Sequence, residues 1–356
     1  MGVKLPSEAQ IGQNKEKKTG MNMEICGSHV DFGETASNLR SVDRAEIISL
    51  QDNMVEALCT TDGKNVLTAG QWVRIDQGED LPLTMAEHGF SLLIRIWAGK
   101  EEHTILFDAG HSLNGVLTNA DILKLDLRDI EAVVLSHGHH DHWGGVTPIL
   151  KKLKRKKLPL VLHPAVFNIR GVEENGKIIK LTPFPSKTRL ESLGAQIIEH
   201  KTPLFLADDT ILVMGEVPRV TDFEHGFSPG RVKKEGRWHP EPEMADDRGL
   251  VIHIKGKGLV VISGCAHSGI VNNLLYARKL TLERLPIYAV LGGFHLAGPK
   301  FEPRISTTVT AVKDFHPSFV IPSHCTGWKA MYRFAREIPH AFVYPGTGKL
   351  YRFFSG

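Results

Sequence analysis

The segment 137–142 constrains the fold of this chain more than any other, because it places three histidines and a carboxylate within six residues. Their spacing is H-x-H-x-D-H. Imidazole and carboxylate groups are ligands of Zn²⁺, Fe and Mn²⁺, so four of them this close together indicate a metal site. The apolar run 130–135 predicts a strand before the motif, and 146–153 predicts a helix after it. The candidate ligands are therefore expected on a strand-to-helix loop held by rigid elements.

The alternation of strand and helix continues along the chain. Strands are predicted at 45–50, 90–97, 104–107, 158–163, 250–254, 259–262, 287–291 and 319–322, and further helices at 271–280 and 305–315. Residues 165–245, which are rich in Gly, Pro and charge, predict strands with long loops. This alternation predicts an α/β layered architecture. Several predicted strands end in His, Asp or Cys, which indicates one site where strand ends converge.

Bulk properties narrow the class of protein. A chain of 356 residues with 42% hydrophobic content can form a large core. The net charge of +3 argues against a dedicated nucleic-acid binder, and no apolar run is long enough for a membrane span. The four cysteines form no C-x-x-C pair, which favours a reducing compartment over a disulfide framework. We expect a cytoplasmic protein with a small-molecule substrate; a homo-oligomer is compatible with the sequence.

The domain organisation follows from the hydrophobic pattern. Residues 1–43 are polar and lack periodicity, which predicts a flexible N-terminal extension before one domain at 44–356. The basic run 151–157 ends a predicted helix. Cations there complement the helix dipole, so we interpret the run as a solvated surface rather than a nucleic-acid contact.

Taken together, the motifs resemble those of the metallo-β-lactamase-fold superfamily. The resemblance rests on Ser136–His142 and on the strand Leu106–Gly110 before it. Further motifs are similar to the subgroup that includes the archaeal dihydropterin–ribofuranosylaminobenzene phosphate synthase: 87–91, 215–219, 246–247, 264–272, 292–296 and 323–327. The resemblance covers about 47–348. It implies a four-layer αββα sandwich, in which two mixed sheets face each other, helices lie outside, and the metal site lies at the shared edge.

The resemblance also implies a ligand set. In the superfamily the first two histidines of the motif hold one metal, which assigns His137 and His139 to a first site. The Asp-His pair holds the second metal, which assigns Asp141 and His142 to a second site. His324 follows the predicted strand 319–322 and fits the last histidine of the pattern.

The chain departs from the superfamily pattern in two places. No Gly-His-Thr segment follows the first half, and Cys265 stands where the Asp of a Gly-Asp loop is expected, with His267 two residues later. We expect one or both of these residues to supply the missing ligand, and we favour His267. A thiolate at Cys265 would favour Zn²⁺ or Fe over Mg²⁺. The alternatives are a small buried residue at Cys265 and a role for His267 in orienting another ligand.

Other residues are candidates for contact with substrate or for support. His295 ends a predicted strand and could bind metal or substrate. Glu216 and Arg219 could reach substrate, or could form a structural ion pair. Asp108 ends the strand beneath the motif and is expected to support a ligating histidine. We expect His88 to pack near the rim of the site.

These residues predict a metal-dependent enzyme. Two divalent ions, expected to be Zn²⁺ with Fe, Mn and Mg as alternatives, would bind a hydroxide that attacks a carbonyl or phosphoryl centre. Asp141 would position the attacking water or accept its proton. We predict a hydrolase that acts on an anionic, phosphate-type small molecule. The resemblance implies an alternative, a transferase that joins a dihydropterin diphosphate to an arylamine ribofuranosyl phosphate and releases pyrophosphate. A redox or non-catalytic metalloprotein is the third hypothesis.

Overall fold

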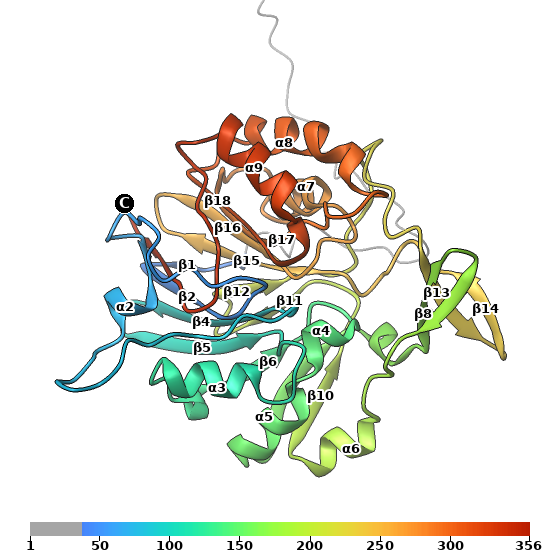
Figure 1. The fold of residues 1–356 in the computed structure, drawn as a ribbon, viewed down its shortest axis with the longest axis horizontal. Coiled ribbons are helices and arrows are strands. Elements are labelled where there is room, and N and C mark those ends of the chain that lie inside the picture. The colour runs from blue at the N-terminus through green and yellow to red at the C-terminus, as the bar shows by residue number, and fades with distance from the viewer. Residues whose placement is uncertain (1–37) are drawn as a thin grey trace, which may run out of the picture.

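The computed structural model describes residues 38–356, which form two β-sheets packed face to face with helices on both outer sides (Figure 1). The first sheet contains, in spatial order, β10 (Ala195–Glu199), β7 (Leu158–Leu162), β6 (Ala132–Val134), β5 (Glu101–Phe107), β4 (Ser91–Ala98), β2 (Arg44–Gln51), β19 (Leu350–Phe354) and β3 (Val66–Leu67). Strands β5, β6, β7 and β10 run parallel, and the others pair antiparallel.

The second sheet repeats this plan with the later part of the chain. It contains β11 (Leu204–Leu206), β12 (Ile211–Val213), β15 (Gly249–Ile254), β16 (Gly258–Ser263), β17 (Ile287–Gly293) and β18 (Phe319–Ser323), and β1 (Ser41–Val42) also pairs with β15. In each sheet an antiparallel pair leads into parallel strands, β4–β5–β6 in the first and β15–β16–β17 in the second. Both sheets are therefore mixed, as predicted.

Helices cover the two outer faces. The first sheet is covered by α3 (Gly115–Ile122), α5 (Val146–Leu153) and α6 (Lys187–Ser192), and the second by α7 (Ile270–Leu280), α8 (Ile305–Asp314) and α9 (Trp328–Glu337) (Figure 1). Two short helices, α2 (Ala69–Trp72) and α4 (His140–Trp143), lie at the ends of strands and loops. The predicted αββα sandwich is confirmed.

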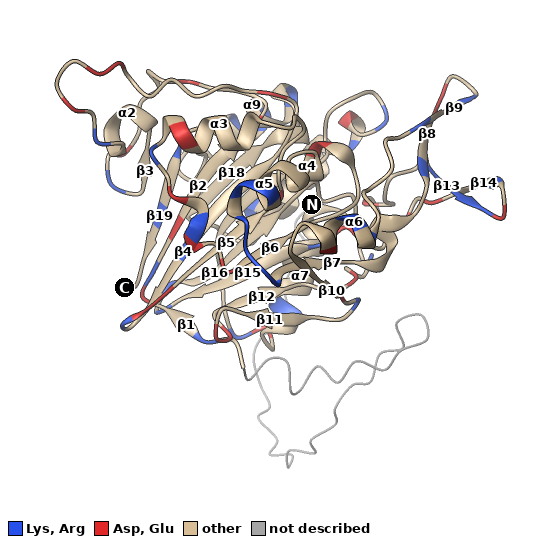
Figure 2. Cartoon of the chain, turned by 90° about the horizontal axis from the view of Figure 1, so that it is seen from below, with Lys and Arg blue, Asp and Glu red and all other residues tan. Residues whose placement is uncertain are grey.

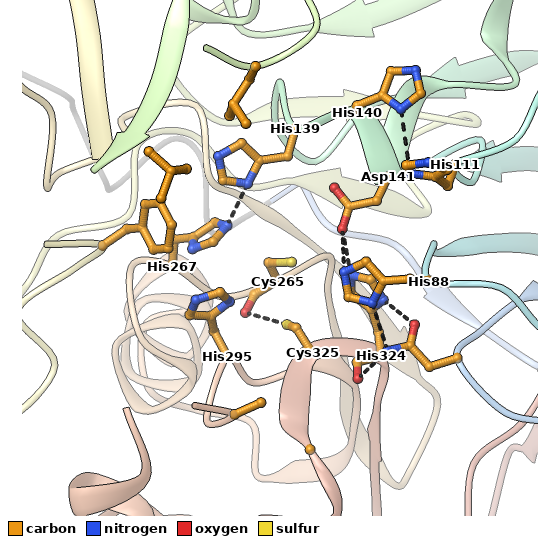
Figure 3. A pocket seen from close by; sticks show the side chains of 16 residues that line it. His88, His111, His139, His140, Asp141, Cys265, His267, His295, His324 and Cys325 are labelled. Atoms are coloured by element: carbon orange, nitrogen blue, oxygen red, sulfur yellow. Dashed lines mark hydrogen bonds and ion pairs between the residues drawn. The ribbon is translucent and has the colours of Figure 1, made fainter. Parts of the chain in front are cut away.

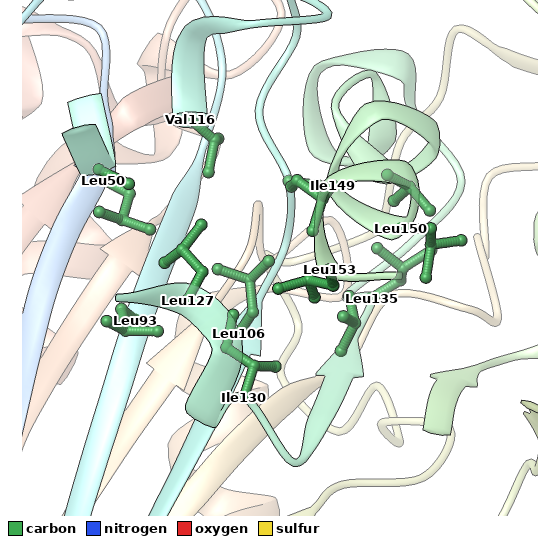
Figure 4. Close-up of a cluster of buried hydrophobic side chains, with 14 of the residues drawn as sticks. Leu50, Leu93, Leu106, Val116, Leu127, Ile130, Leu135, Ile149, Leu150 and Leu153 are labelled. Carbon is green, nitrogen blue, oxygen red and sulfur yellow. The ribbon is translucent and has the colours of Figure 1, made fainter. Parts of the chain in front are cut away.

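Three apolar layers hold these elements together. One lies between the two sheets and combines residues such as Phe107 and Val134 with Ile262 and Leu291. A second lies beneath α7, α8 and α9. The third, shown in Figure 4, lies beneath α3 and α5. Helix α5 contributes the positions i, i+3, i+4 and i+7, all buried: Val146, Ile149, Leu150 and Leu153.

A small antiparallel sheet projects beside the sandwich (Figure 1). It consists of β14 (Arg237–Pro240), β13 (Gly230–Lys234), β8 (Arg170–Glu174) and β9 (Lys177–Lys180). We call these four strands, together with the residues that directly adjoin them (Leu181 and 225–229), the lobe. It lies in the region 165–245 that was predicted to hold strands and long loops.

Two sequence expectations concern the ends and the surface. The predicted extension 1–43 falls mostly outside the described residues, and its last residues include β1, which pairs with β15. The basic run 151–157, blue in Figure 2, lies at and just after the C-terminal end of α5. Its Lys and Arg residues are exposed. Within residues 38–356, the helices are all too short or too polar to cross a membrane.

Candidate metal centre

The candidate ligands lie where strand ends from both sheets converge (Figure 3). The motif 137–142 follows β6 of the first sheet, and Cys265, His295 and His324 follow β16, β17 and β18 of the second. Parallel strands place their carboxyl ends at one edge, and this edge is shared by the two sheets. The predicted convergence of strand ends is thus present.

The backbone at these strand ends is left-handed at four residues that are not glycine. Asp108, Ala266, His295 and His324 have φ values of 60°, 53°, 45° and 49°. Such a conformation costs roughly 1–3 kcal/mol per residue and persists only where the surroundings impose it. Four residues at this one edge thus adopt an unfavourable backbone conformation, and they include the candidate ligands His295 and His324.

A first cluster consists of three histidines. His267 Nε2 lies 3.2 Å from His137 Nε2 and 3.2 Å from His139 Nδ1. Donor atoms around a tetrahedral Zn²⁺ with bonds of about 2.0–2.1 Å lie about 3.3 Å apart, so this cluster fits a zinc ion. Burial lowers the pKa of His137 and His267 well below its usual value and that of His139 to about 4. All three rings are therefore neutral near pH 7 and can bind a metal.

A second cluster surrounds Asp141. The Oδ2 atom of Asp141 lies 3.3 Å from His324 Nε2, 3.4 Å from His88 Nε2 and 3.8 Å from His142 Nε2. His324 Nε2 is buried and has no well-aligned hydrogen-bond partner among the described residues, which suits a nitrogen that would bind a metal ion. Burial by itself raises the pKa of Asp141, but His142, His324 and His88 outweigh it and lower this pKa well below its usual value. Asp141 is therefore an ionised carboxylate.

Cys265 lies between the two clusters. Its Sγ is 3.1 Å from His142 Nε2, and it can share a metal with His137 and His142. His267 belongs to the first cluster. Both residues that were considered for the missing ligand therefore face the centre, and a thiolate at Cys265 would be the anionic donor between the two positions.

Hydrogen bonds anchor the outward-facing ring nitrogens of His137 and His142. His137 Nδ1 lies 2.9 Å from Ser136 Oγ, and His142 Nδ1 lies 2.7 Å from Asp108 Oδ2. Asp108 also accepts a hydrogen bond from Ser136 Oγ at 2.7 Å. Burial by itself lowers the pKa of His142, but Asp108 and Asp141 outweigh it and raise this pKa to about 9. The structure thus places Asp108 in the supporting role that was expected of it.

Two adjacent carboxylates, Asp246 and Asp247, accept hydrogen bonds from two loops that carry candidate ligands. Asp246 Oδ2 accepts the Gly138 N–H at 2.8 Å, inside the histidine motif. Asp247 Oδ2 accepts the N–H of Ser268 at 2.9 Å, next to His267. Burial by itself raises the pKa of Asp246, but Arg170, bonded to it at 2.6 Å, outweighs burial and lowers this pKa to about 2.

The centre opens into a cavity of about 610 Å³ (Figure 3). His88, Asp141, the two buried cysteines and His295 line it, together with an apolar wall from the lobe and its connections. That wall contains Val172, Leu181 and Phe227. No Lys or Arg within residues 38–356 is among the lining side chains.

Two of the three predicted substrate contacts lie outside the cavity. Glu216 Oε1 bonds His163 Nε2 at 3.0 Å, and neither Glu216 nor Arg219 lines the cavity. His295 does line it. His88, which was expected to pack near the rim, lines the cavity and faces Asp141. Asn53 Oδ1 accepts a hydrogen bond from His324 Nδ1 at 2.9 Å. Asn53 lies two residues beyond the end of β2, so its position after a strand could have identified it as a candidate for the site.

Comparisons with known proteins agree with this geometry. The family model described as the metallo-beta-lactamase superfamily matches residues 85–272, more than half of the chain. The chain is 31% identical to 7,8-dihydropterin-6-methyl-4-(beta-D-ribofuranosyl)-aminobenzene-5'-phosphate synthase of Methanocaldococcus jannaschii, over 75% of this chain and 90% of that protein. It is also 31% identical to the uncharacterised protein MJ0448 of the same organism, over 74% of this chain and 93% of that one.

A solved structure has the same fold. The crystal structure of Tm1679, described as a metal-dependent hydrolase of the beta-lactamase superfamily, superposes with a TM-score of 0.62. The match covers 86% of this chain and 98% of that chain, at 22% sequence identity.

Proposed function

Because the chain belongs to the metallo-β-lactamase superfamily, we propose that it is a metal-dependent hydrolase that acts on an anionic, phosphate-type small molecule at a two-metal centre. The observation that carries this proposal is the pair of donor clusters at the floor of one cavity. His137, His139 and His267 would hold one ion. Asp141, His142 and His324 would hold the other, with Cys265 between them. Bound divalent ions would acidify a water molecule and stabilise negative charge on the substrate.

Charge arithmetic supports an anionic substrate. The histidine cluster contributes neutral donors, and the anionic donors are Asp141 and, once deprotonated, Cys265. Two divalent ions therefore keep a net positive charge. Since the cavity lining carries no Lys or Arg, that positive charge is the principal attraction for an anionic group.

Asp141 is the proposed proton acceptor. Its carboxylate is ionised and lies at the cavity, where it can orient a water molecule by hydrogen bonding and take its proton. His88, whose side chain is 67% exposed, lies 3.4 Å from the same carboxylate and connects it to solvent.

The test measures hydrolysis by zinc-loaded protein of bis(p-nitrophenyl) phosphate, a diphosphate ester and a carboxylic ester. We expect phosphoester cleavage that is lost on chelation and in Asp141→Ala. His340→Ala, a change at an exposed histidine, is the matched control and should keep full activity. The absence of chelator-sensitive phosphoester cleavage in the wild-type protein would overturn the proposal.

A second candidate function rests on the 31% identity to the protein named as a synthase, across most of both chains. The same centre would then stabilise a leaving pyrophosphate, and Phe227 and Val172 would contact a flat ring. Pyrophosphate release from a dihydropterin diphosphate distinguishes the two functions. If pyrophosphate is released only when an arylamine is added, the transferase is supported. If pyrophosphate is released equally without the arylamine, the hydrolase is supported.

A further inference from the structure

We propose that Cys265, His295 and Cys325 form a third metal site, for a thiophilic ion such as Zn²⁺, beside the two-metal centre. One donor atom of each residue, two Sγ atoms and an imidazole nitrogen, lies within 4.8 Å of the other two. The proposed hydrolytic function uses neither Cys325 nor His295 as a metal ligand. The third site therefore goes beyond that function.

The topology of the second sheet brings these residues together. Strands β16, β17 and β18 are parallel neighbours, and they end at Ser263, Gly293 and Ser323. Each proposed ligand lies two residues beyond the end of its strand. The register pairs Gly293 with Ser323 and Gly292 with Ser263, so β17 and β18 end level and β16 ends one residue earlier. The three loops that carry the proposed ligands therefore begin side by side.

Local packing keeps the two thiols close. A side chain at Gly293 would place a Cβ 2.6 Å from Cys325 Sγ and 3.2 Å from Cys265 Cα. Glycine at this position leaves space for the Cys325 thiol and for the backbone of Cys265. Cys325 Sγ also lies 3.6 Å from the Cys265 carbonyl oxygen (Figure 3).

His295 completes the donor set. Its Nδ1 is buried and has no hydrogen-bond partner among the described residues. Burial of a polar atom without a partner is unfavourable in free energy. A bound ion would satisfy this nitrogen. The ring faces the cavity beside His267, with ring centroids 4.3 Å apart.

The donor chemistry selects the ion. Two thiolates and one imidazole suit Zn²⁺ and other thiophilic ions, and they disfavour Mg²⁺ and Ca²⁺, which take oxygen ligands. All three residues line the cavity, so a fourth position can be open to a ligand. Cys265 also lies 3.1 Å from His142 Nε2, and its sulfur would therefore bridge the third ion and the two-metal centre.

The experiment counts bound ions and bound thiolates. Metal-free full-length protein, kept reduced with a phosphine, is titrated without oxygen with Co²⁺, and thiolate-to-cobalt charge-transfer absorption is recorded. Zn²⁺ stoichiometry is measured in parallel by native mass spectrometry. We expect a third equivalent in the wild-type protein. Cys325→Ser should lose that equivalent and about two-thirds of the charge-transfer absorption, because both thiolate bonds to the third ion are lost and only the bond from Cys265 to the two-metal centre remains.

The controls separate this site from the two-metal centre. His295→Ala should lose the third equivalent, and Cys59→Ser, a change at a cysteine outside every candidate ligand group, should keep it. Cys325→Ala, checked by circular dichroism, replaces Cys325→Ser if the serine protein does not fold. Two equivalents in the wild-type protein, or an unchanged spectrum in a folded Cys325 variant, would overturn the third site. Metal-dependent phosphoester cleavage would survive that outcome, so the hydrolase proposal is tested separately.

Discussion

At the scale of single residues, the contacts of the outward-facing ring nitrogens determine which nitrogens can bind metal. Ser136, Asp108 and Asn53 hold the Nδ1 atoms of His137, His142 and His324. Each contact fixes the ring and turns Nε2 toward the centre.

Substitution of Asp108 tests this anchoring. Asp108→Asn keeps the size of the side chain but leaves one accepting oxygen in place of two. The carboxylate now accepts from the Ser136 N–H at one oxygen and from the Ser136 hydroxyl and His142 at the other, and an amide nitrogen cannot accept at either position. We expect the Zn²⁺ affinity to fall about 10–100-fold, measured by competition with a chromophoric chelator. Asp121→Asn, at an exposed surface ion pair, is the control. An unchanged affinity in Asp108→Asn would show that His142 does not need this anchor.

Removal of one ligand tests the assignment of the first cluster. His137→Ala removes a nitrogen 3.2 Å from His267 Nε2. The first cluster should therefore lose its metal ion, while the second cluster, around Asp141, should keep its metal ion. Metal analysis of the purified protein should show one equivalent less than in His340→Ala, and phosphoester cleavage should be lost. Full metal content in His137→Ala would refute the assignment.

At the scale of secondary-structure elements, the Asp246-Asp247 pair joins two loops from different sheets. Asp246 bonds the loop after β6, and Asp247 bonds the loop after β16. Arg170, on β8, neutralises Asp246 and thereby connects the lobe to the same point. One dipeptide therefore holds both loops that supply the first cluster.

The low pKa of Asp246 predicts a pH dependence of stability. This pKa is about 2 in the folded protein and about 3.9 when unfolded, so the unfolded state binds the proton at higher pH. The ionised carboxylate contributes about 2–3 kcal/mol of stability above pH 4, and this contribution is lost as the pH falls toward 2. Asp246→Asn should remove this part of the pH dependence, measured by urea unfolding of metal-free protein. The exposed Asp314→Asn should keep the wild-type profile, and a parallel profile in Asp246→Asn would contradict the assignment.

The features that could be predicted from the sequence are those encoded by residues close together in the chain. The motif 137–142, the strand before it and α5 are encoded in one stretch, and strand ends located Cys265 and His324. The partner of Glu216 could not be predicted, because His163 is 53 residues away in sequence. His88 was underestimated because it precedes a strand instead of following one, and only the packed fold brings it to Asp141.

At the scale of the whole molecule, the sandwich supplies the metal ligands and the lobe supplies the wall that faces them. The inter-sheet core fixes the two halves relative to each other, so their strand ends meet at one edge. The lobe adds an apolar surface on the other side of the cavity. We therefore expect the sandwich to carry the chemistry and the lobe to influence the choice of substrate.

Phe227 is the side chain that tests this division. Its ring stacks on Phe301 with centroids 5.9 Å apart, and its edge contacts His267 and His295 at 4.8 and 5.3 Å. Phe227→Leu keeps apolar volume but removes the aromatic face. An aromatic pair contributes about 0.5–1.5 kcal/mol, so KM for a substrate with a flat ring should rise about 2–10-fold, while kcat and metal content stay unchanged. Phe319→Leu, in the ring cluster with Tyr288 and Phe353, is the control. An unchanged KM, or a lower kcat accompanied by metal loss, would mean that Phe227 supports the centre rather than the substrate.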